Sequence, residues 1–191
     1  LLRDGLTVVI SPLIALMRDQ VRALQASGVA AGALTSANTQ QETDAVFEAL
    51  NAGKLKLLYL APERLAADSM QSVLRRYHVS MLAVDEAHCA SERGHDFRPA
   101  YLRLREMLER YGRPPVLALT ATATESVRDD PVRILALDDP PIIVASPHRP
   151  HLCFEVIECG STARLRALTR LILRLRRPGI IYCSTTKEVD A

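Results

Sequence analysis

The sequence predicts an α/β fold in which a parallel sheet is flanked by helices. Short apolar runs recur along the chain, and they are continuous rather than alternating, as in strands buried on both faces. Stretches with helical periodicity separate the early runs, and strands joined by helices pair in parallel. Of the 191 residues 48% are hydrophobic and 24% charged, a soluble globular composition that excludes a disordered chain.

The elements can be assigned in chain order. Residues 14–27 carry an apolar stripe at helical spacing and end at Gly28, and residues 41–50 form a second candidate helix. In a third candidate, residues 125–137, Pro131 is expected to kink or split the helix. The expected strands are the apolar runs 6–10, 55–60, 81–84, 116–119, 142–144, 152–157 and 179–182.

A proline-rich segment, residues 146–151, divides the chain into two parts. We expect residues 1–145 to form one nearly complete α/β unit and residues 152–191 to begin a second. No apolar run approaches ~20 residues, so no membrane helix is expected, and the first residues lack the pattern of a secretory signal. The chain begins without Met, so we expect it to be internal to a longer reading frame.

The four cysteines form no C-x-x-C pair and predict a reduced, cytosolic protein. We expect Cys153 to be buried in the strand 152–157. A metal site formed by His148, His151, Cys153 and Cys159 is the alternative, but its loose spacing argues against zinc.

Polar motifs follow four of the predicted strands. Because the carboxyl ends of parallel strands share one edge of a sheet, where ligands bind, these motifs should converge. They are Ser11-Pro12, Pro62-Glu63-Arg64, Asp85-Glu86-Ala87-His88 and Thr120-Ala121-Thr122.

Asp85 and Glu86 are the chemical centre of this edge. A carboxylate at a strand end suits Mg²⁺ held against nucleotide phosphates, and a neighbouring Glu can orient and deprotonate an attacking water. The alternative for an Asp-Glu pair at this position is an ordinary helix cap.

With these motifs in place, the chain resembles the RecQ-type DNA helicases of helicase superfamily two. The resemblance covers essentially the whole chain, and the loop 91–101 so soon after Asp-Glu-Ala-His is its discriminating part. It implies a RecA-like parallel sheet flanked by helices and the start of a second RecA-like lobe. The segments that carry it are 84–89 (Walker B), 91–101 (aromatic-rich loop), 11–20, 59–65, 119–124 and 179–184.

The resemblance also implies roles. Asp85 would coordinate Mg²⁺ and Glu86 would activate water for ATP hydrolysis. The residues that would couple nucleotide state to DNA are His88, Thr120, Thr122, Arg93, His95, Phe97 and Arg98. Those that would contact single-stranded or partly duplex DNA are Ser11, Pro12, Glu63, Arg64, Phe97 and Arg98. The implied activity is 3′-to-5′ unwinding in DNA repair and recombination, in the bacterial cytosol or nucleoid.

The chain departs from this family in its phosphate cradle. It contains no G-x-x-x-x-G-K-[ST] run. We therefore expect an internal part of a motor core, inactive alone. The alternative is a nucleic-acid-binding module that has lost ATPase function, and an RNA helicase is disfavoured by the loop 94–99. Arg93 replaces the family's Trp, and Pro147 and His151 replace its Phe and Asn.

The segment 163–177 carries six arginines and no acid, together with an apolar stripe. It predicts a helix, whose basic side is either a solvated face or a flank that meets phosphates.

Overall fold

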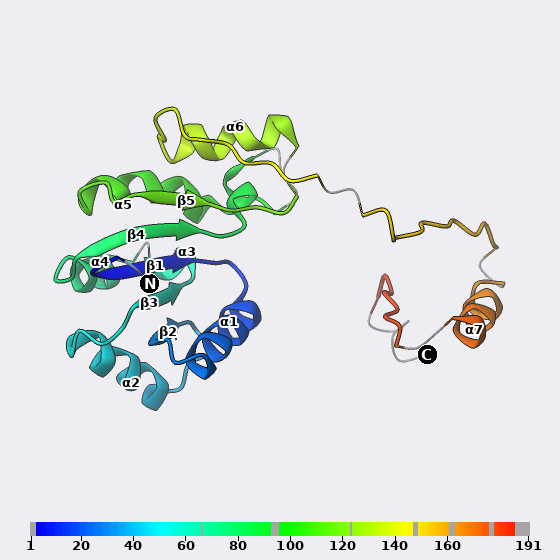
Figure 1. The fold of residues 1–191 in the computed structure, drawn as a ribbon, viewed down its shortest axis with the longest axis horizontal. Coiled ribbons are helices and arrows are strands. Elements are labelled where there is room, and N and C mark those ends of the chain that lie inside the picture. Colours follow the sequence, from blue (N-terminus) through cyan, green and yellow to red (C-terminus); the bar gives the residue numbers. More distant parts are fainter. Residues whose placement is uncertain are drawn as a thin grey trace. The chain divides into compact units, whose positions relative to one another are not determined.

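A computed structural model describes residues 3–65, 67–92, 96–122, 124–146, 149–160, 163–175 and 178–185, apart from the side chain of Ser126 (Figure 1). The structure divides into two units, one ending at Ile142 and the other starting at Ile143. Each unit is described by itself below. The identity of the second unit as the start of another lobe stays a prediction.

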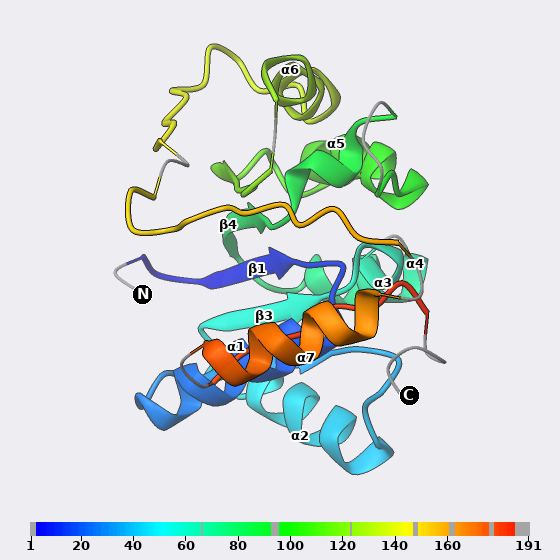
Figure 2. The ribbon, with the colours of Figure 1, turned by 90° about the vertical axis from the view of Figure 1, so that its right-hand side faces the viewer.

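The first unit is built on a five-stranded sheet of order β2-β3-β1-β4-β5 in which all neighbours pair in parallel. The predicted α/β fold with a parallel sheet is therefore confirmed, and Figure 2 shows β1, β3 and β4 lying alongside one another. The strands are β1 (Leu6–Ile10), β2 (Ala31–Leu34), β3 (Leu57–Leu60), β4 (Val79–Val84) and β5 (Val116–Ala118).

Helices follow most strands. The helices are α1 (Ile14–Ala26), α2 (Gln40–Asn51), α3 (Pro62–Leu65), α4 (Asp68–Leu74), α5 (Leu104–Arg110), α6 (Glu125–Ile134) and α7 (Arg164–Arg174), with short 3₁₀ helices η1 (Ala87–Ala90) and η2 (Pro99–Arg103). Thr39 caps α2 by accepting a hydrogen bond from the Glu42 amide, and the Glu42 carboxylate accepts one from the Thr39 amide.

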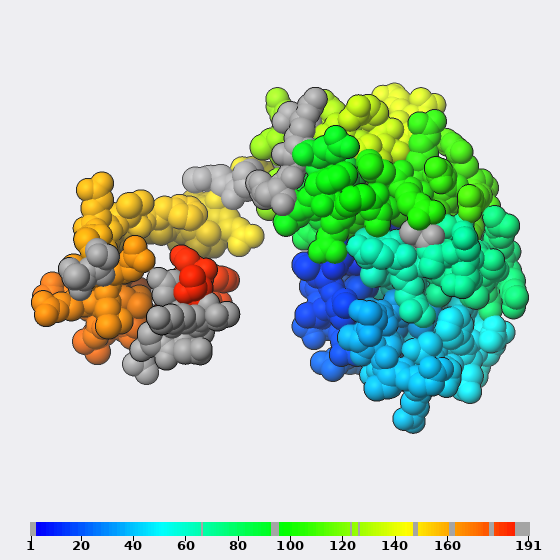
Figure 3. Space-filling view, turned by 180° about the vertical axis from the view of Figure 1, so that it is seen from behind, coloured from blue at the N-terminus to red at the C-terminus, as the bar shows by residue number. Residues whose placement is uncertain are grey.

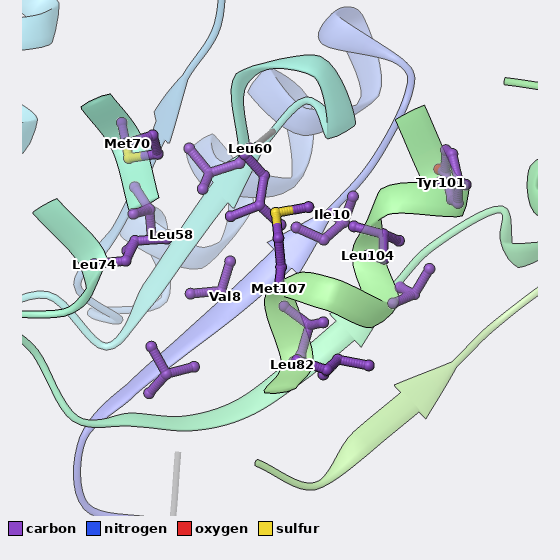
Figure 4. Close-up of a cluster of buried hydrophobic side chains, with 14 of the residues drawn as sticks. Val8, Ile10, Leu58, Leu60, Met70, Leu74, Leu82, Tyr101, Leu104 and Met107 are labelled. Atoms are coloured by element: carbon purple, nitrogen blue, oxygen red, sulfur yellow. The ribbon is translucent and has the colours of Figure 1, made fainter. Parts of the chain in front are cut away.

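Apolar side chains cover both faces of the sheet. On one face Met17 and Val21 of α1 pack against Val9 and Tyr59. On the other face α4 and α5 pack against the strands, with Met70, Leu74, Leu104 and Met107 over Val8, Ile10, Leu58 and Leu82 (Figure 4). In Figure 3 the blue start of the chain lies beside green and cyan segments, as the central position of β1 requires.

Strand β2 was not expected from the sequence. Its Ala-Gly-Ala-Leu stretch lacks the large β-branched run that marks a strand. Small residues are needed there, because a Cβ on Gly32 would lie 3.1 Å from a methyl carbon of Val46 in α2. Close packing of α2, rather than strand propensity, therefore explains this segment.

The expected strands 142–144, 152–157 and 179–182 are wrong, because no strand forms there. Their side chains are largely exposed (Ile143 94%, Phe154 93%, Val156 90%). Among the described residues these segments have no neighbouring strand to pair with, and an extended chain without such a partner gains no ladder hydrogen bonds. Cys153 is likewise exposed rather than buried in a strand, and no disulfide links the four cysteines.

One helix departs from expectation, and another agrees with it. Helix α6 continues through Pro131 without splitting, and the Asp130 carboxylate beside it is bound by Ser91 at 2.5 Å and Arg133 at 2.8 Å. These two hydrogen bonds hold the helix at the residue just before the proline. Helix α7 confirms the predicted basic helix, but none of its residues is buried. No helix in the described part of the chain has the length and apolar character needed to span a bilayer.

Candidate functional site

The polar motifs that follow β1, β3, β4 and β5 meet at one edge of the sheet, as predicted. The amide of Ser11 donates to the Leu60 carbonyl at 3.1 Å, and the amide of Asp85 donates to the Ile10 carbonyl at 2.8 Å. The amide of Leu119 donates to the Val84 carbonyl at 2.8 Å. These bonds extend the parallel pairing past the strand ends and hold the four motifs in register.

Asp85 is fixed at the centre of this edge by three neighbours. Its Oδ2 accepts a hydrogen bond from Ser11 Oγ at 3.1 Å, and its Oδ1 accepts one from the Glu86 amide at 3.0 Å. The Tyr101 hydroxyl donates to the Asp85 carbonyl at 3.0 Å. Both carboxylate oxygens are thereby held in one orientation. Asp85 therefore presents its negative charge in a fixed direction.

Glu86 has a left-handed backbone, with φ 48° and ψ 45°. A non-glycine residue in this region costs about 1–3 kcal/mol and persists only where surrounding contacts impose it. Here the next amide, of Ala87, donates to the Leu119 carbonyl at 2.8 Å. The Glu86 side chain makes no capping hydrogen bond to η1, so the helix-cap alternative does not describe it.

His88 joins two of the strand-end motifs. Its Nδ1 lies 2.9 Å from Thr120 Oγ1 and 3.2 Å from Glu86 Oε2. The ring is 9% exposed. Glu86, His88 and Thr120 thus form one connected group. The coupling role that the resemblance implies for His88 and Thr120 stays a prediction.

A second group of predicted residues lies around α3. Glu63 of α3 pairs with Arg98 of the loop after η1, with 3.7 Å between Oε1 and Nη1. Arg64 is half-buried, and its Nε is buried without a hydrogen-bond partner in the described part of the chain. Pro12 and Phe97 are half-buried. The motif after β3 and the loop before η2 are therefore brought together.

Some predicted site residues are placed differently or not described. Ser11 is fully buried, so in this structure it orients Asp85. Thr122 is exposed, with its amide 3.4 Å from Thr120 Oγ1. Arg93, Gly94 and His95 lie outside the described residues.

The structure adds three residues to which sequence reasoning assigned no role. Tyr101 is fully buried beneath Asp85, and burial raises the pKa of its hydroxyl far above the usual value, so it remains a donor. Ser91 and Asp130 form a buried hydrogen bond that ties the segment after His88 to α6. Tyr101 and Ser91 stood within the recognised loop, whereas nothing in the sequence marked Asp130.

The donor set at the strand ends fits a magnesium ion that is shared with phosphates. Asp85 and Glu86 offer hard carboxylate oxygens, and Mg²⁺ commonly takes only one or two such ligands and keeps several waters. Within the described ranges no three His, Cys, Asp or Glu residues gather as a metal cage. Of the alternative metal set, His148 lies outside those ranges.

Comparison with protein families decides the assignment. The model of the family described as DEAD/DEAH box helicase matches residues 2–130. The chain belongs to the DEAD/DEAH box helicase family. Within this family the matched span contains β1 to β5 and the whole candidate site.

The curated relatives of this family member confirm the resemblance to RecQ-type helicases. The chain is 40% identical over 188 residues to the "ATP-dependent DNA helicase RecQ" of Pasteurella multocida, covering 98% of this chain and 29% of the relative. It is 40% identical over 186 residues to the "Probable ATP-dependent DNA helicase RecS" of Bacillus subtilis, covering 96% and 37%. The chain thus spans about a third of the length of these relatives.

Solved structures agree on the fold. The Hef helicase domain of Pyrococcus furiosus matches 70% of this chain and 28% of its own, with a TM-score of 0.50 and 20% identity. Mss116p, solved bound to ssRNA and AMP-PNP, matches 68% of this chain and 27% of its own, with a TM-score of 0.53 and 16% identity. At these identities the match shows a RecA-like helicase fold and nothing more.

Proposed function

We propose that this helicase-family chain is part of the motor of an ATP-dependent DNA helicase that unwinds DNA in the 3′-to-5′ direction, in cytosolic DNA repair and recombination. The observation that carries the proposal is the connected group of Asp85, Glu86, His88 and Thr120 at one sheet edge. It combines a metal-binding carboxylate, a second carboxylate beside it, and a link to the next strand end. The names of the relatives support ATP and DNA as substrates.

Each carboxylate has a distinct part in this proposal. Asp85, oriented by Ser11 and the Glu86 amide, would hold Mg²⁺ against the nucleotide phosphates. The ion would supply charge neutralisation at the transferring phosphoryl group. Glu86 would accept a proton from the attacking water. The His88 contact at 3.2 Å holds the Glu86 carboxylate in place.

DNA would lie along the second group of residues. Arg98 and Arg64 supply cations that can meet backbone phosphates, the main source of affinity for nucleic acid. Phe97 offers a ring on which a base can stack. The Glu63–Arg98 pair connects the two segments, so DNA that engages Arg98 also acts on α3.

One feature favours a second candidate, a nucleic-acid-binding module without ATPase function. The chain has no G-x-x-x-x-G-K-[ST] segment, which supplies the amides and Lys that hold the β and γ phosphates. The two candidates differ once that segment is supplied. We therefore define the chimera as the Pasteurella multocida relative with its matching 188-residue segment replaced by this chain.

The chain alone is expected to hydrolyse ATP no faster than background, because nothing in it cradles the terminal phosphates. The chimera should show DNA-stimulated phosphate release of at least ~1 s⁻¹, the lower end of ordinary enzyme turnover. Phosphate release with and without a single-stranded oligonucleotide checks both. A chimera that binds DNA but does not hydrolyse ATP would favour the non-catalytic module. Turnover of at least ~1 s⁻¹ by the chain alone would contradict the inference that it lacks the phosphate-binding segment needed for hydrolysis.

Substituting His88 should weaken the link between DNA binding and hydrolysis. In the chimera, His88→Ala and Thr120→Val should each lower DNA-stimulated turnover about tenfold, and the double variant should lose no more than the worse single variant, because both remove one hydrogen bond. The measurement is a double-mutant cycle on ATPase rate with saturating DNA. Thr169→Val, the same change at an exposed threonine of α7 outside the candidate site, is the control. Fully additive losses would show that the two residues act separately.

A further inference from the structure

A cavity of about 730 Å³ opens at the sheet edge opposite the candidate site. It lies where β1, β4 and β5 begin and where α4 and α5 end, and Figure 1 shows α4 and α5 on the side where β4 begins. Because the candidate site is at the carboxyl ends of the same strands, the two places are separate. Nothing in the proposed ATPase or DNA contacts uses this cavity.

The cavity wall is strongly cationic. Four arginines line it, namely Arg3, Arg75, Arg110 and Arg113, against a single acidic residue, Asp4. Close together, like charges repel one another, so a gathering of this kind is most stable when an anion lies among them. The net positive wall therefore favours an anionic ligand.

Three of the arginines are oriented by bonds to the protein. Arg3 Nη1 donates to the Ser80 carbonyl at 3.1 Å, and Arg110 Nη1 donates to Gln71 Oε1. Arg113 Nη2 lies 3.1 Å from the Glu109 carboxylate. Each of these bonds uses only part of a guanidinium that carries five N–H donors, so donors remain for a ligand.

Arg75 differs from the other three. It is exposed, and no hydrogen bond or ion pair within the described part of the chain engages its side chain. Its charge and that of Arg110 act on the Tyr111 hydroxyl, where they oppose the rise in pKa that burial causes. Arg75, Arg110 and Tyr111 all line the same cavity.

The Tyr111 hydroxyl is the second observation that points to a ligand. It is buried and has no hydrogen-bond partner among the residues that the structure describes. Buried polar groups almost always have one, and a buried hydroxyl without a partner is destabilising. Because Tyr111 lines the cavity, a ligand whose entry turns this side chain toward the cavity would supply that partner.

We propose that this cavity binds a small anion that carries two or more phosphate groups. Arginine forks match phosphate oxygens in paired hydrogen bonds, and the Tyr111 hydroxyl can donate to a third oxygen. The volume is within the range of roughly 300–1,000 Å³ typical of small-molecule sites. Tyr77, Pro114 and Pro115 add apolar wall for the remainder of such a molecule.

The test uses the whole chain and inorganic tripolyphosphate as the probe, with affinity measured by titration calorimetry at low salt. Arg75→Ala should weaken binding about tenfold or more, the effect of losing charged hydrogen bonds. Arg76→Ala is the matched control, since Arg76 is the adjacent exposed arginine and does not line the cavity. Circular dichroism of each variant verifies that the fold is retained.

Tyr111→Phe separates a ligand-binding role of the hydroxyl from a purely structural one, because affinity and melting temperature should respond differently. It should weaken tripolyphosphate binding several-fold, while the unliganded protein melts at the same or a higher temperature because an unsatisfied hydroxyl has been removed. A lower melting temperature with unchanged affinity would contradict the assigned role of the hydroxyl.

Four outcomes would overturn the proposal. The first is no binding of tripolyphosphate, and the second is equal affinity in wild type, Arg75→Ala and Arg76→Ala. The third is loss of binding in Asp85→Asn but not in Arg75→Ala, which would place the anion at the candidate ATP site. The fourth is a single-stranded oligonucleotide that is weakened by Arg75→Ala to the same extent and that matches tripolyphosphate in affinity per phosphate. In that case the ligand is a DNA backbone, and the small-anion proposal is wrong.

Discussion

Replacing Glu86 by Gln in the chimera should lower the rate of ATP hydrolysis by about 100-fold or more while ATP still binds. The amide keeps the size of the side chain but cannot accept a proton from water, and a positioned general base contributes roughly 10²–10⁴-fold. Single-turnover hydrolysis and fluorescent-nucleotide binding measure the two effects separately.

Asp85→Asn should instead affect nucleotide affinity. It removes one negative charge at the position where Ser11 Oγ and the Glu86 amide orient the carboxylate, so the affinity for Mg·ATP should fall, and raising the magnesium concentration should restore part of it. Glu106→Gln, at an exposed position on α5, is the charge-matched control and should change neither quantity. If Glu86→Gln and Asp85→Asn both hydrolyse ATP at the unmodified rate, the assignment of this motif is wrong.

Ile10→Ala should be among the most destabilising single changes in the first unit. Ile10 is fully buried in the central strand, and its carbonyl accepts the hydrogen bond from the Asp85 amide (Figure 4). Large-to-small changes in a core cost about 2–5 kcal/mol, a large part of a total stability of roughly 5–15 kcal/mol. Urea unfolding followed by circular dichroism measures the change in the free energy of unfolding.

Ile10→Val is the matched control for that experiment, because it removes one methylene and should cost only about 0.5–1.5 kcal/mol. The Val variant should bind nucleotide normally in the chimera. Equal stability of the Ala and Val variants would contradict this prediction. It would show that the core closes the space left by the Ile10 side chain without cost, and that packing around Ile10 does not stabilise the neighbouring candidate site.

The central sheet and the site edge could be predicted because both depend on local patterns. Buried parallel strands appear as continuous apolar runs, and parallel topology alone brings Ser11, Asp85 and Thr120 to one edge. The contact of His88 with Thr120 was not predicted. The resemblance implied only a coupling role for each residue, and nothing in the spacing of residues 32 positions apart specifies a hydrogen bond.

The failures have physical causes of a different kind. Strand β2 consists mostly of small residues, which allow α2 to pack closely against it. Its sequence therefore lacks the run of large apolar residues that predicts a strand. The apolar runs after Ile142 have strand composition, but a strand exists only when a neighbour pairs with it. The left-handed backbone of Glu86 and the buried Asp130 arise from tertiary contacts that no local pattern encodes.

Strand β5 is one of the two edge strands at which this sheet can be extended. It pairs with β4 on one side, and in the described part of the chain no strand pairs with its other side. Leu117 and Leu119 are 45% and 46% exposed beside that open backbone, which makes β5 a template for another strand. A strand added there in parallel would end beside Thr120, so the residues that follow it would enter the site next to Asp85 and Glu86. At high protein concentration the same edge would template association between copies of the chain.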